Sequence, residues 1–248
     1  MRLDVAFLPS LVHTTERTVC VVIDLVRATT TICTLFERGC SAVFAARTVD
    51  DARAFARDRP ALLCGERQGS KVPGFDYGNS PVEFHSLDLS GKDVVLSTTN
   101  GTVALHAVRD APLVLTACLR NAQTVVHDVL KVSAVVPWDV TLVCAGAANA
   151  LALDDAYCAG YLVTLIQRAM SSQDVDITDA ARMAGRLYAS YNSPLDAIQE
   201  SFSRRSLADI GLGHDLPFVA ELNTSTVVPR LVKPGLAARY PIHLAMPS

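Results

Sequence analysis

The sequence predicts a three-layer α/β/α fold with a largely parallel sheet. Six short apolar segments, rich in Val, Leu and Cys and without strict alternation, are typical of parallel strands buried on both faces. Segments with helical periodicity separate most of them, and this alternation favours a parallel sheet between two helical layers. Half of the 248 residues are apolar and 19% are charged, which indicates a well-buried interior.

The expected elements follow one another along the chain. The strands are expected over residues 18–24, 41–46, 61–65, 93–98, 112–118 and 139–144. Helical patterns lie between them over residues 30–38, 50–58, 101–109 and 121–131. Three further helices are expected over residues 153–170, 176–191 and 194–203, before a segment over 224–232 that could return as a strand. We expect one unit over residues 1–248, with two similar lobes of about 1–110 and 111–248 as the alternative.

Composition excludes several classes of protein. The formal net charge of −3 supplies no global basic field, so we expect neither nucleic acid nor a membrane surface as a partner. Seven cysteines without a CxxC pair favour reduced thiols over disulfides or a zinc site. No signal peptide is expected, and the longest helical apolar stretch is too short to cross a bilayer. We therefore expect a cytoplasmic protein, whose apolar excess also suits a homo-oligomer interface.

Polar clusters follow five of the six expected strands. They lie at residues 24–31, 65–69, 97–102, 120–121 and 145–155. The carboxyl ends of parallel strands meet at one edge of a sheet, and ligands bind in the crevice there. The five clusters are therefore expected to converge.

Each cluster also has an ordinary structural interpretation. Asp24 could be a turn residue or a helix cap, and Asn100-Gly101 could form a tight turn. Against this, the three threonines at 29–31 are poor helix formers, whereas hydroxyls beside open helix N–H groups suit an anion. Gly101 would equally let backbone amides approach a phosphate.

The segment 65–83, GERQGSKVPGFDYGNSPVE, is a long loop of the kind that usually has a function. Its end matches a capping box with proline at the first helical position, so Ser80 and Glu83 are interpreted as structural. Glu66, Arg67 and Asp76 have no such local explanation.

Three motifs carry a resemblance to a known family. They are Ile23-Asp24-Leu25-Val26-Arg27-Ala28-Thr29-Thr30-Thr31, the loop from Gly65-Glu66-Arg67 to Gly74-Phe75-Asp76-Tyr77-Gly78-Asn79-Ser80-Pro81, and Thr98-Thr99-Asn100-Gly101-Thr102. Read together, they resemble the 2-phosphosulfolactate phosphatases over most of the chain. The resemblance implies a Mg²⁺-dependent phosphohydrolase on an α/β/α scaffold. It would convert 2-phospho-3-sulfolactate to 3-sulfolactate and phosphate, a step towards coenzyme M.

One departure from the family pattern leaves alternatives open. Val103 stands where an arginine commonly follows the Thr-Thr-Asn-Gly-Thr motif, so the substrate could be a related small phosphorylated hydroxy acid. Val103 is also the sequence support for a non-catalytic anion-binding relative that keeps the crevice without turnover. A purely structural oligomer subunit would leave the five polar loops unexplained.

The resemblance, together with the negative charge of a phosphomonoester, assigns the expected roles. Mg²⁺ prefers carboxylate oxygens, so Asp24 and Glu66 are expected to hold it, with Asp76 or Asp155 as further candidates. The expected catalytic residues are Asp24, Arg27, Glu66, Arg67 and Asn100, with the arginines neutralising phosphate oxygens.

Substrate contacts are expected from residues of the same loops. They are Thr29, Thr30, Thr31, Lys71, Asn79, Thr98, Thr99, Gly101, Thr102 and Asn121, with Lys71 and Arg120 placed to meet the other acidic groups of the substrate. In-line attack by water with a carboxylate as base is the simplest chemistry, and a covalent intermediate through Asp24 is the alternative.

Overall fold

The computed structural model describes residues 1–170, 175–232 and 242–247, and all six predicted strands form. The strands are β1 (Arg2–Ala6), β2 (Thr18–Ile23), β3 (Ala42–Ala45), β4 (Ala61–Arg67), β5 (Ser70–Lys71), β6 (Asp93–Ser97), β7 (Leu113–Ala117), β8 (Asp139–Cys144), β9 (Asp176–Ile177), β10 (Arg230–Val232) and β11 (Ile242–Ala245). The helices are the short 3-10 helix η1 (Pro9–Leu11), α1 (Ala28–Glu37), α2 (Val49–Asp58), α3 (Pro81–His85), α4 (Gly101–Ala107), α5 (Ala122–Val135), α6 (Leu153–Ala169), α7 (Asp179–Ala189), α8 (Pro194–Glu200), α9 (Phe202–Asp209) and α10 (Asp215–Val219).

The strands form one mixed sheet in the order β5-β4-β6-β3-β11-β10-β7-β2-β8-β1-β9. It contains two parallel blocks, β4-β6-β3 and β7-β2-β8-β1. The β10–β11 hairpin joins them through three antiparallel pairings, so the hydrogen-bond pattern alone would point the two blocks in opposite directions. The division at about residue 110 does not coincide with this boundary, because β1 and β2 lie in the same block as β7 and β8.

Sheet twist turns the two blocks back towards each other. Adjacent strands rotate by roughly 20–25°, so the six steps from β4 to β2 accumulate on the order of 120–150°. The carboxyl ends of β2, β4 and β6 therefore meet, as the residues that line the cavity below demonstrate. The loops after β2, β4 and β6 converge as expected, although the sheet as a whole is mixed. The loop after β8 joins them through Ala147 and Ala148, so four of the five polar clusters contribute to the cavity, and the cluster at 120–121 does not.

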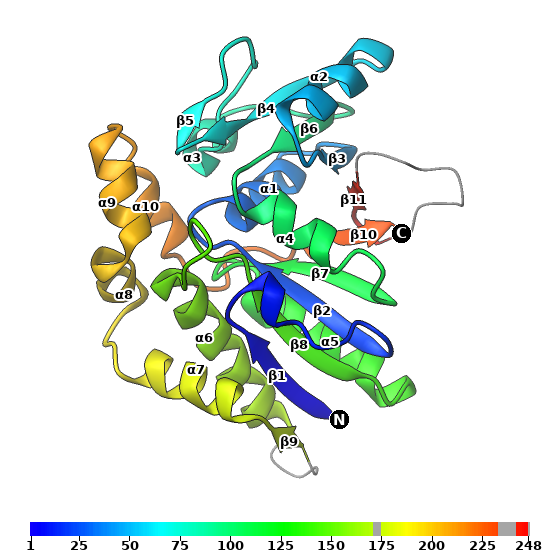
Figure 1. Cartoon of the computed structure of the whole chain (residues 1–248), viewed down its shortest axis with the longest axis vertical. Coiled ribbons are helices and arrows are strands. Elements are labelled where there is room, and N and C mark those ends of the chain that lie inside the picture. The colour runs from blue at the N-terminus through cyan, green and yellow to red at the C-terminus, as the bar shows by residue number, and fades with distance from the viewer. Residues whose placement is uncertain (171–174, 233–241, 248) are drawn as a thin grey trace.

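The helices form layers on both faces of this sheet. In Figure 1, α1 and α4 lie between the two blocks, and their Leu35 and Leu105 share one core with Leu96 of β6 and Val22 of β2. On the other face of the β4-β6-β3 block, α2 packs near Phe44. On the β7-β2-β8-β1 block, α5 and α6 cover the face that lies away from α1 and α4. The architecture is thus α/β/α, as predicted.

The structure differs from the prediction mainly outside the central strands. β1 was not anticipated, although it pairs in parallel with β8. The helix predicted over 194–203 is two helices, because the Ser201 side chain accepts a hydrogen bond from the Arg204 N–H and starts α9. The segment 224–232 forms a strand only at its end, as β10, and residues 233–241 of the tail lie outside the described part of the chain.

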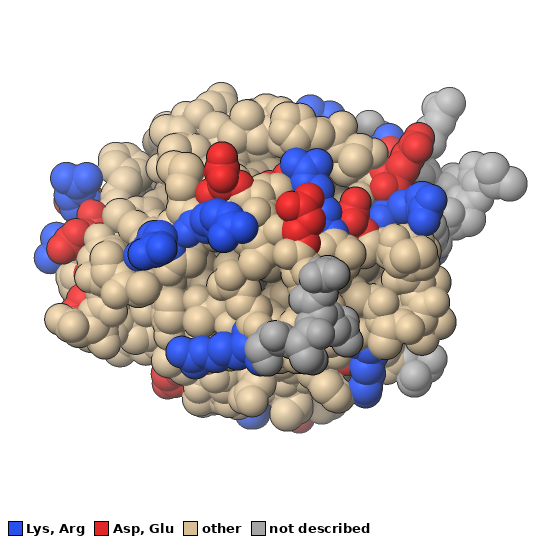
Figure 2. Space-filling model, turned by 90° about the horizontal axis from the view of Figure 1, so that it is seen from below, with Lys and Arg blue, Asp and Glu red and all other residues tan. Residues whose placement is uncertain are grey.

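Other expectations from composition can be compared with the structure. All seven cysteines are buried, and none of them is paired in a disulfide in the described part of the chain. In the described part of the chain, no helix combines the length and apolarity that crossing a membrane requires. On the face shown in Figure 2, basic and acidic side chains are interspersed between larger uncharged areas.

Candidate functional site

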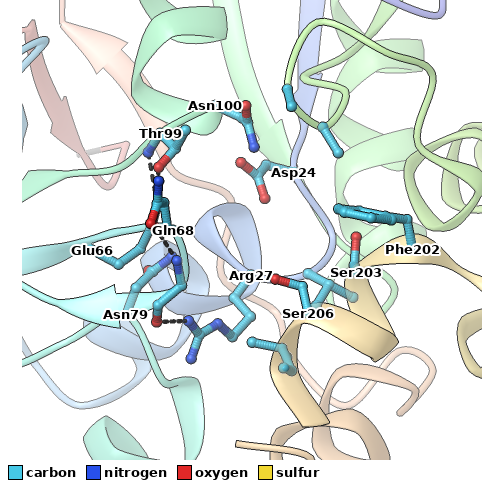
Figure 3. Close-up of a pocket in the computed structure, with 15 residues that line it drawn as sticks. Asp24, Arg27, Glu66, Gln68, Asn79, Thr99, Asn100, Phe202, Ser203 and Ser206 are labelled. Carbon is cyan, nitrogen blue, oxygen red and sulfur yellow. Dashed lines mark hydrogen bonds between the residues drawn. The ribbon is translucent and has the colours of Figure 1, made fainter. Parts of the chain in front are cut away.

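A cavity of about 280 Å³ lies where the two strand blocks meet. Three strand ends supply most of its polar wall: Asp24 and Arg27 after β2, Glu66 and Gln68 around the end of β4, and Thr99 and Asn100 after β6. Figure 3 shows Phe202, Ser203 and Ser206 of α9 facing these groups from the other side. Asn79, Gly69, Val26, Leu207 and the turn at Ala147-Ala148 complete the lining.

Asp24 is the carboxylate that projects into this cavity (Figure 3). Its Oδ1 accepts a hydrogen bond from the Ala28 N–H at the start of α1, whereas its Oδ2 receives none from any described residue. Burial raises the pKa of Asp24 to about 7, and the negative charges of Glu66 and Asp154 act in the same direction. The site therefore holds a poorly compensated carboxylate, which is the environment that a cation would stabilise.

Gly101 allows α4 to pack against Asp24. A Cβ atom built at this position would lie 2.5 Å from the Ala28 Cβ and 2.7 Å from the Asp24 Oδ2. Close packing therefore requires glycine at the first position of α4. Gly101 contributes to the site by leaving room for the Asp24 carboxylate.

Arg27 lines the cavity, but its charge is already compensated. One terminal nitrogen, Nη1, lies 3.0 Å from the Asp215 Oδ2 in an ion pair that is almost fully buried. The other, Nη2, donates a hydrogen bond of 2.8 Å to the Gly69 carbonyl. Asp215 comes from α10, so this contact also attaches a distant helix to the β2–α1 turn.

Glu66 joins two loops of the site. Its Oε1 accepts the Thr99 N–H at 2.7 Å, and its Oε2 accepts the Gly69 N–H and the Thr99 hydroxyl. Both oxygens are thus engaged by neutral donors. Glu66 holds the turn after β4 against the loop that leads into α4, and its lone pairs are less available to a metal than the Asp24 Oδ2.

The predicted threonines split into two groups. Thr99 lines the cavity. The others are buried, and their hydroxyls bond within the protein. Thr29, Thr30 and Thr31 donate to the carbonyls of Asp24, Leu25 and Asn79. Thr98 and Thr102 bond to each other's main chain, so these five hydroxyls hold the loops in shape and do not line the cavity.

Several other predicted residues lie outside the cavity wall. Arg67 donates to Ser97 and to the Glu66 carbonyl, and Asp76 accepts the Leu63 N–H on an exposed loop. Asn121 uses both ends of its amide on buried backbone groups. Arg120 is paired with Glu37 and Glu221 over the ring of Phe218.

Asp155 is buried behind the site and connects two of its loops by hydrogen bonds. Its two oxygens accept the N–H groups of Leu25 and Gly146, so it ties the β2–α1 turn to the loop after β8. Burial and the charges of Asp154 and Asp24 raise its pKa well above the ordinary range. Its neighbour Asp154, buried as well, accepts a hydrogen bond of 3.0 Å from the Ser203 hydroxyl of α9.

The α9 wall was missed by the sequence analysis. Phe202, Ser203, Ser206 and Leu207 belong to a segment whose pattern resembles an ordinary amphipathic helix, and nothing in it marks a site. The available signal was Ser201, which repeats the capping role of Ser193 and indicates a new helix start.

The described residues contain no group of three or more His, Cys, Asp or Glu side chains arranged to hold a metal ion. Mg²⁺, however, often binds through one or two protein carboxylates, with waters and substrate phosphate oxygens completing its shell. The unbonded Asp24 Oδ2, close to the charges of Glu66 and Asp154, meets that requirement. The donor set fits a cation held chiefly through Asp24.

Comparison with known proteins bears on the same residues. A model of the family described as 2-phosphosulpholactate phosphatase matches residues 6–234. A probable 2-phosphosulfolactate phosphatase from Deinococcus radiodurans is 39% identical over 237 residues, 95% of each chain. Proteins with the same description from Thermus thermophilus (38% over 232 residues, 93% of this chain and 94% of the relative) and Parasynechococcus marenigrum (40% over 223 residues, 87% and 90%) are similarly close.

The family match extends over the loops after β2, β4 and β6 and also over α9, so it includes every segment that lines the cavity. Both the likeness in sequence and the site geometry therefore refer to the same surface. From the extent of this match we conclude that the chain belongs to the 2-phosphosulpholactate phosphatase family.

Proposed function

We propose that this protein is a phosphoric monoester hydrolase that releases phosphate from 2-phospho-3-sulfolactate, with Mg²⁺ bound at Asp24. The observation that carries the proposal is the buried Asp24 carboxylate, whose Oδ2 faces the cavity without a hydrogen-bond donor among the described residues. A doubly charged phosphate ester would be repelled by this carboxylate unless a cation lay between them.

The residues around Asp24 have distinct roles in this proposal. Asp24 would hold the cation, which supplies positive charge to the transferring phosphoryl group when bound. The side chains of Asn100, Gln68 and Asn79 line the cavity as neutral donors for anionic oxygens. Glu66 acts through Thr99 and Gly69, whose positions it sets.

The wall opposite Asp24 supplies apolar surface. Phe202 and Leu207 of α9 line it, and Leu207 is buried whereas Phe202 is 59% exposed. A bound substrate would cover this surface, and the loss of water there would strengthen the interaction of the phosphate with the charges around it. Arg27, which is paired with Asp215, would contribute to the local potential and orient the β2–α1 turn.

The binding-only alternative has no structural support of its own. Val103, the residue that suggested it, is absent from the described lining of the cavity. The catalytic proposal is therefore preferred. With it we also propose a cytoplasmic location, because seven buried free thiols suit a reducing compartment.

The direct test is phosphate release from 2-phospho-3-sulfolactate at graded Mg²⁺ concentrations. Asp24→Asn keeps the shape and the acceptor for the Ala28 N–H but removes the charge, and we expect it to lower kcat by at least about a hundredfold. Asp76→Asn is the matched control, because that carboxylate caps the Leu63 N–H outside the cavity. Near wild-type turnover by Asp24→Asn, or turnover by the wild type that is independent of metal, would contradict the proposal.

A stability measurement tests Asp24 without relying on turnover. Its pKa rises from 3.8 to about 7 on folding, so the folded state binds the proton more tightly. Its contribution to the free energy of unfolding is therefore fully present below pH 4 and is lost as pH rises towards 7. At pH 8 without metal, Asp24→Asn should be more stable than the wild type by up to about 4 kcal/mol.

Addition of Mg²⁺ should reverse part of this difference. We expect Mg²⁺ to raise the Tm of the wild type at pH 8 and to have little effect on Asp24→Asn, because binding to the folded state stabilises it. Equal shifts in the two proteins would place the metal elsewhere.

A further inference from the structure

The β4–β5 hairpin turns at the wall of the cavity through an unusual sequence. Arg67 pairs with Ser70, which leaves Gln68 and Gly69 as a two-residue loop. Both have positive φ angles, 53° and 81°, which is the pattern of a type I′ turn. Such turns favour asparagine, aspartate or glycine at the first central position, because most other side chains are strained in the left-handed region. Glutamine therefore stands here against the local preference of the backbone.

Positive φ angles also mark a second residue of the cavity wall. Five described residues other than glycine have a positive φ, and two of them are asparagines, which tolerate it. Of the other three, Gln68 and Ala148 line the cavity, whereas Arg17 lies just before β2, at the opposite end of that strand. Strained residues of this kind gather at functional sites. Of the two at the cavity, Gln68 has the side chain that can form hydrogen bonds.

The side chain of Gln68 is free although its main chain is fixed. The Gly69 N–H donates to the Glu66 Oε2 at 2.8 Å, and Glu66 also accepts the Thr99 N–H, so the turn is held against the loop before α4. The Gln68 amide group makes no hydrogen bond with a described residue. It is exposed on the wall that faces Phe202 of α9 (Figure 3). The turn thus presents an unused N–H2 group to the cavity from a fixed position.

The proposed substrate would bring acceptors for this group into the cavity. Hydrogen bonds from amides to anionic oxygens are stronger than those between neutral groups, and a phosphate ester supplies several such oxygens. Arg27 is the permanent cation among the described lining residues, and Asp215 already compensates its charge. Neutral donors therefore provide a larger share of the contacts to the phosphate.

We propose that Gln68 is a substrate-binding residue whose amide donates to an oxygen of the phosphate ester, although asparagine or glycine would make its turn more stable. This inference rests on the proposed function and makes it more specific, because it assigns to Gln68 a role in binding and none in bond cleavage. A contact made equally well in the bound substrate and in the transition state changes KM and leaves kcat unaltered.

Two substitutions should move stability and binding in opposite directions. Gln68→Asn suits the turn but withdraws the amide by one methylene, and Gln68→Gly suits the turn and removes the amide. We expect both to raise Tm by about 1–3 °C. The KM for 2-phospho-3-sulfolactate should rise roughly threefold in Gln68→Asn and roughly tenfold in Gln68→Gly, with kcat changed less than about twofold.

Arg17→Asn is the matched control. Arg17 has the same φ of 53° as Gln68 but is absent from the described lining of the cavity, so its replacement should raise Tm and leave KM unchanged. A lower Tm in both Gln68 variants would contradict the strain on which the inference depends.

Calorimetric binding of inorganic phosphate in the presence of Mg²⁺ keeps this test separate from turnover. We expect the Kd of phosphate to rise roughly tenfold in Gln68→Gly and to stay at the wild-type value in Arg17→Asn. Unchanged KM and phosphate affinity in Gln68→Gly would overturn the inference and leave the role of Asp24 intact. Weaker phosphate binding by Gln68→Gly, together with turnover that needs no metal, would instead overturn the proposed chemistry and keep the contact.

Discussion

Asp24 owes its chemical character to the groups packed around it. The Ala28 N–H fixes one oxygen, burial raises its pKa, and Gly101 allows α4 to approach the carboxylate closely. The ordinary interpretation of Asp24 as a turn residue is also correct in part, since it does bond to the start of α1. Capping and chemistry are compatible here because Oδ1 accepts the Ala28 N–H whereas Oδ2 is left for a ligand.

Gly101→Ala tests this packing. The new methyl group would meet Ala28 and the Asp24 carboxylate at 2.5 and 2.7 Å, so we expect a loss of about 1–3 kcal/mol in the free energy of unfolding and a large fall in kcat. Gly185→Ala is the control. Gly185 lies inside α7, its Cβ would make an ordinary 3.7 Å contact with Val163 of α6, and alanine should stabilise the helix slightly. Denaturant unfolding and phosphate release measure the two effects, and an active Gly101→Ala protein would show that α4 can move without consequence.

Among the elements, α9 connects the chemistry of the site to the C-terminal half of the chain. Its side chains form one wall of the cavity, and Ser203 bonds to the buried Asp154 at the start of α6. The helix begins at Ser201, whose hydroxyl accepts the Arg204 N–H and donates to the Ile198 carbonyl. An element of eight residues depends strongly on such a cap, because its own hydrogen bonds are few.

Ser201→Ala should therefore affect both stability and substrate binding. We expect a cost of about 1–2 kcal/mol in unfolding and a KM raised several-fold, since the cavity wall loosens. Ser193→Ala removes the corresponding cap of α8, which does not line the cavity, and should cost about 1 kcal/mol with an unchanged KM. If both variants change KM alike, α9 has no special relation to the site.

At the scale of the whole molecule, the twist of the sheet and one buried ion pair hold the site together. The twist brings the carboxyl ends of two strand blocks to one place despite the antiparallel hairpin between them. Arg27 and Asp215, which are 188 positions apart in the sequence, then join the β2–α1 turn to α10. Ser80 also donates to Asp215, so the 65–83 loop is held by the same carboxylate.

A double-mutant cycle measures this connection. Asp215→Asn leaves Arg27 buried without its counter-charge and should lower the free energy of unfolding by about 3–5 kcal/mol. Adding Arg27→Met removes the unpaired charge, so the double variant should be less destabilised than the sum of the two single variants by at least about 1 kcal/mol. Additive losses in urea unfolding would show that the pair is not energetically coupled.

The local sequence pattern was sufficient to predict the central strands and several residues of the site. The apolar runs of β2, β6, β7 and β8 are continuous because both faces are buried, and this property can be recognised without knowing the neighbours. Ser80 was correctly predicted to cap α3, since capping involves residues only three positions apart. β1 was missed because a short alternating strand is hard to distinguish without its partner β8.

The sequence by itself therefore determined the fold class, the family and the three strand-end loops that contribute Asp24, Glu66 and Asn100 to one cavity. Only the tertiary structure decided that Thr29–Thr31 bond inward, that Arg27 is neutralised by Asp215, and that α9 closes the site. The physical reason is the distance along the chain over which each kind of interaction acts. Periodicity and capping act over a few residues, whereas the charge and hydrogen bonds left free for a ligand depend on partners that folding brings from far along the chain.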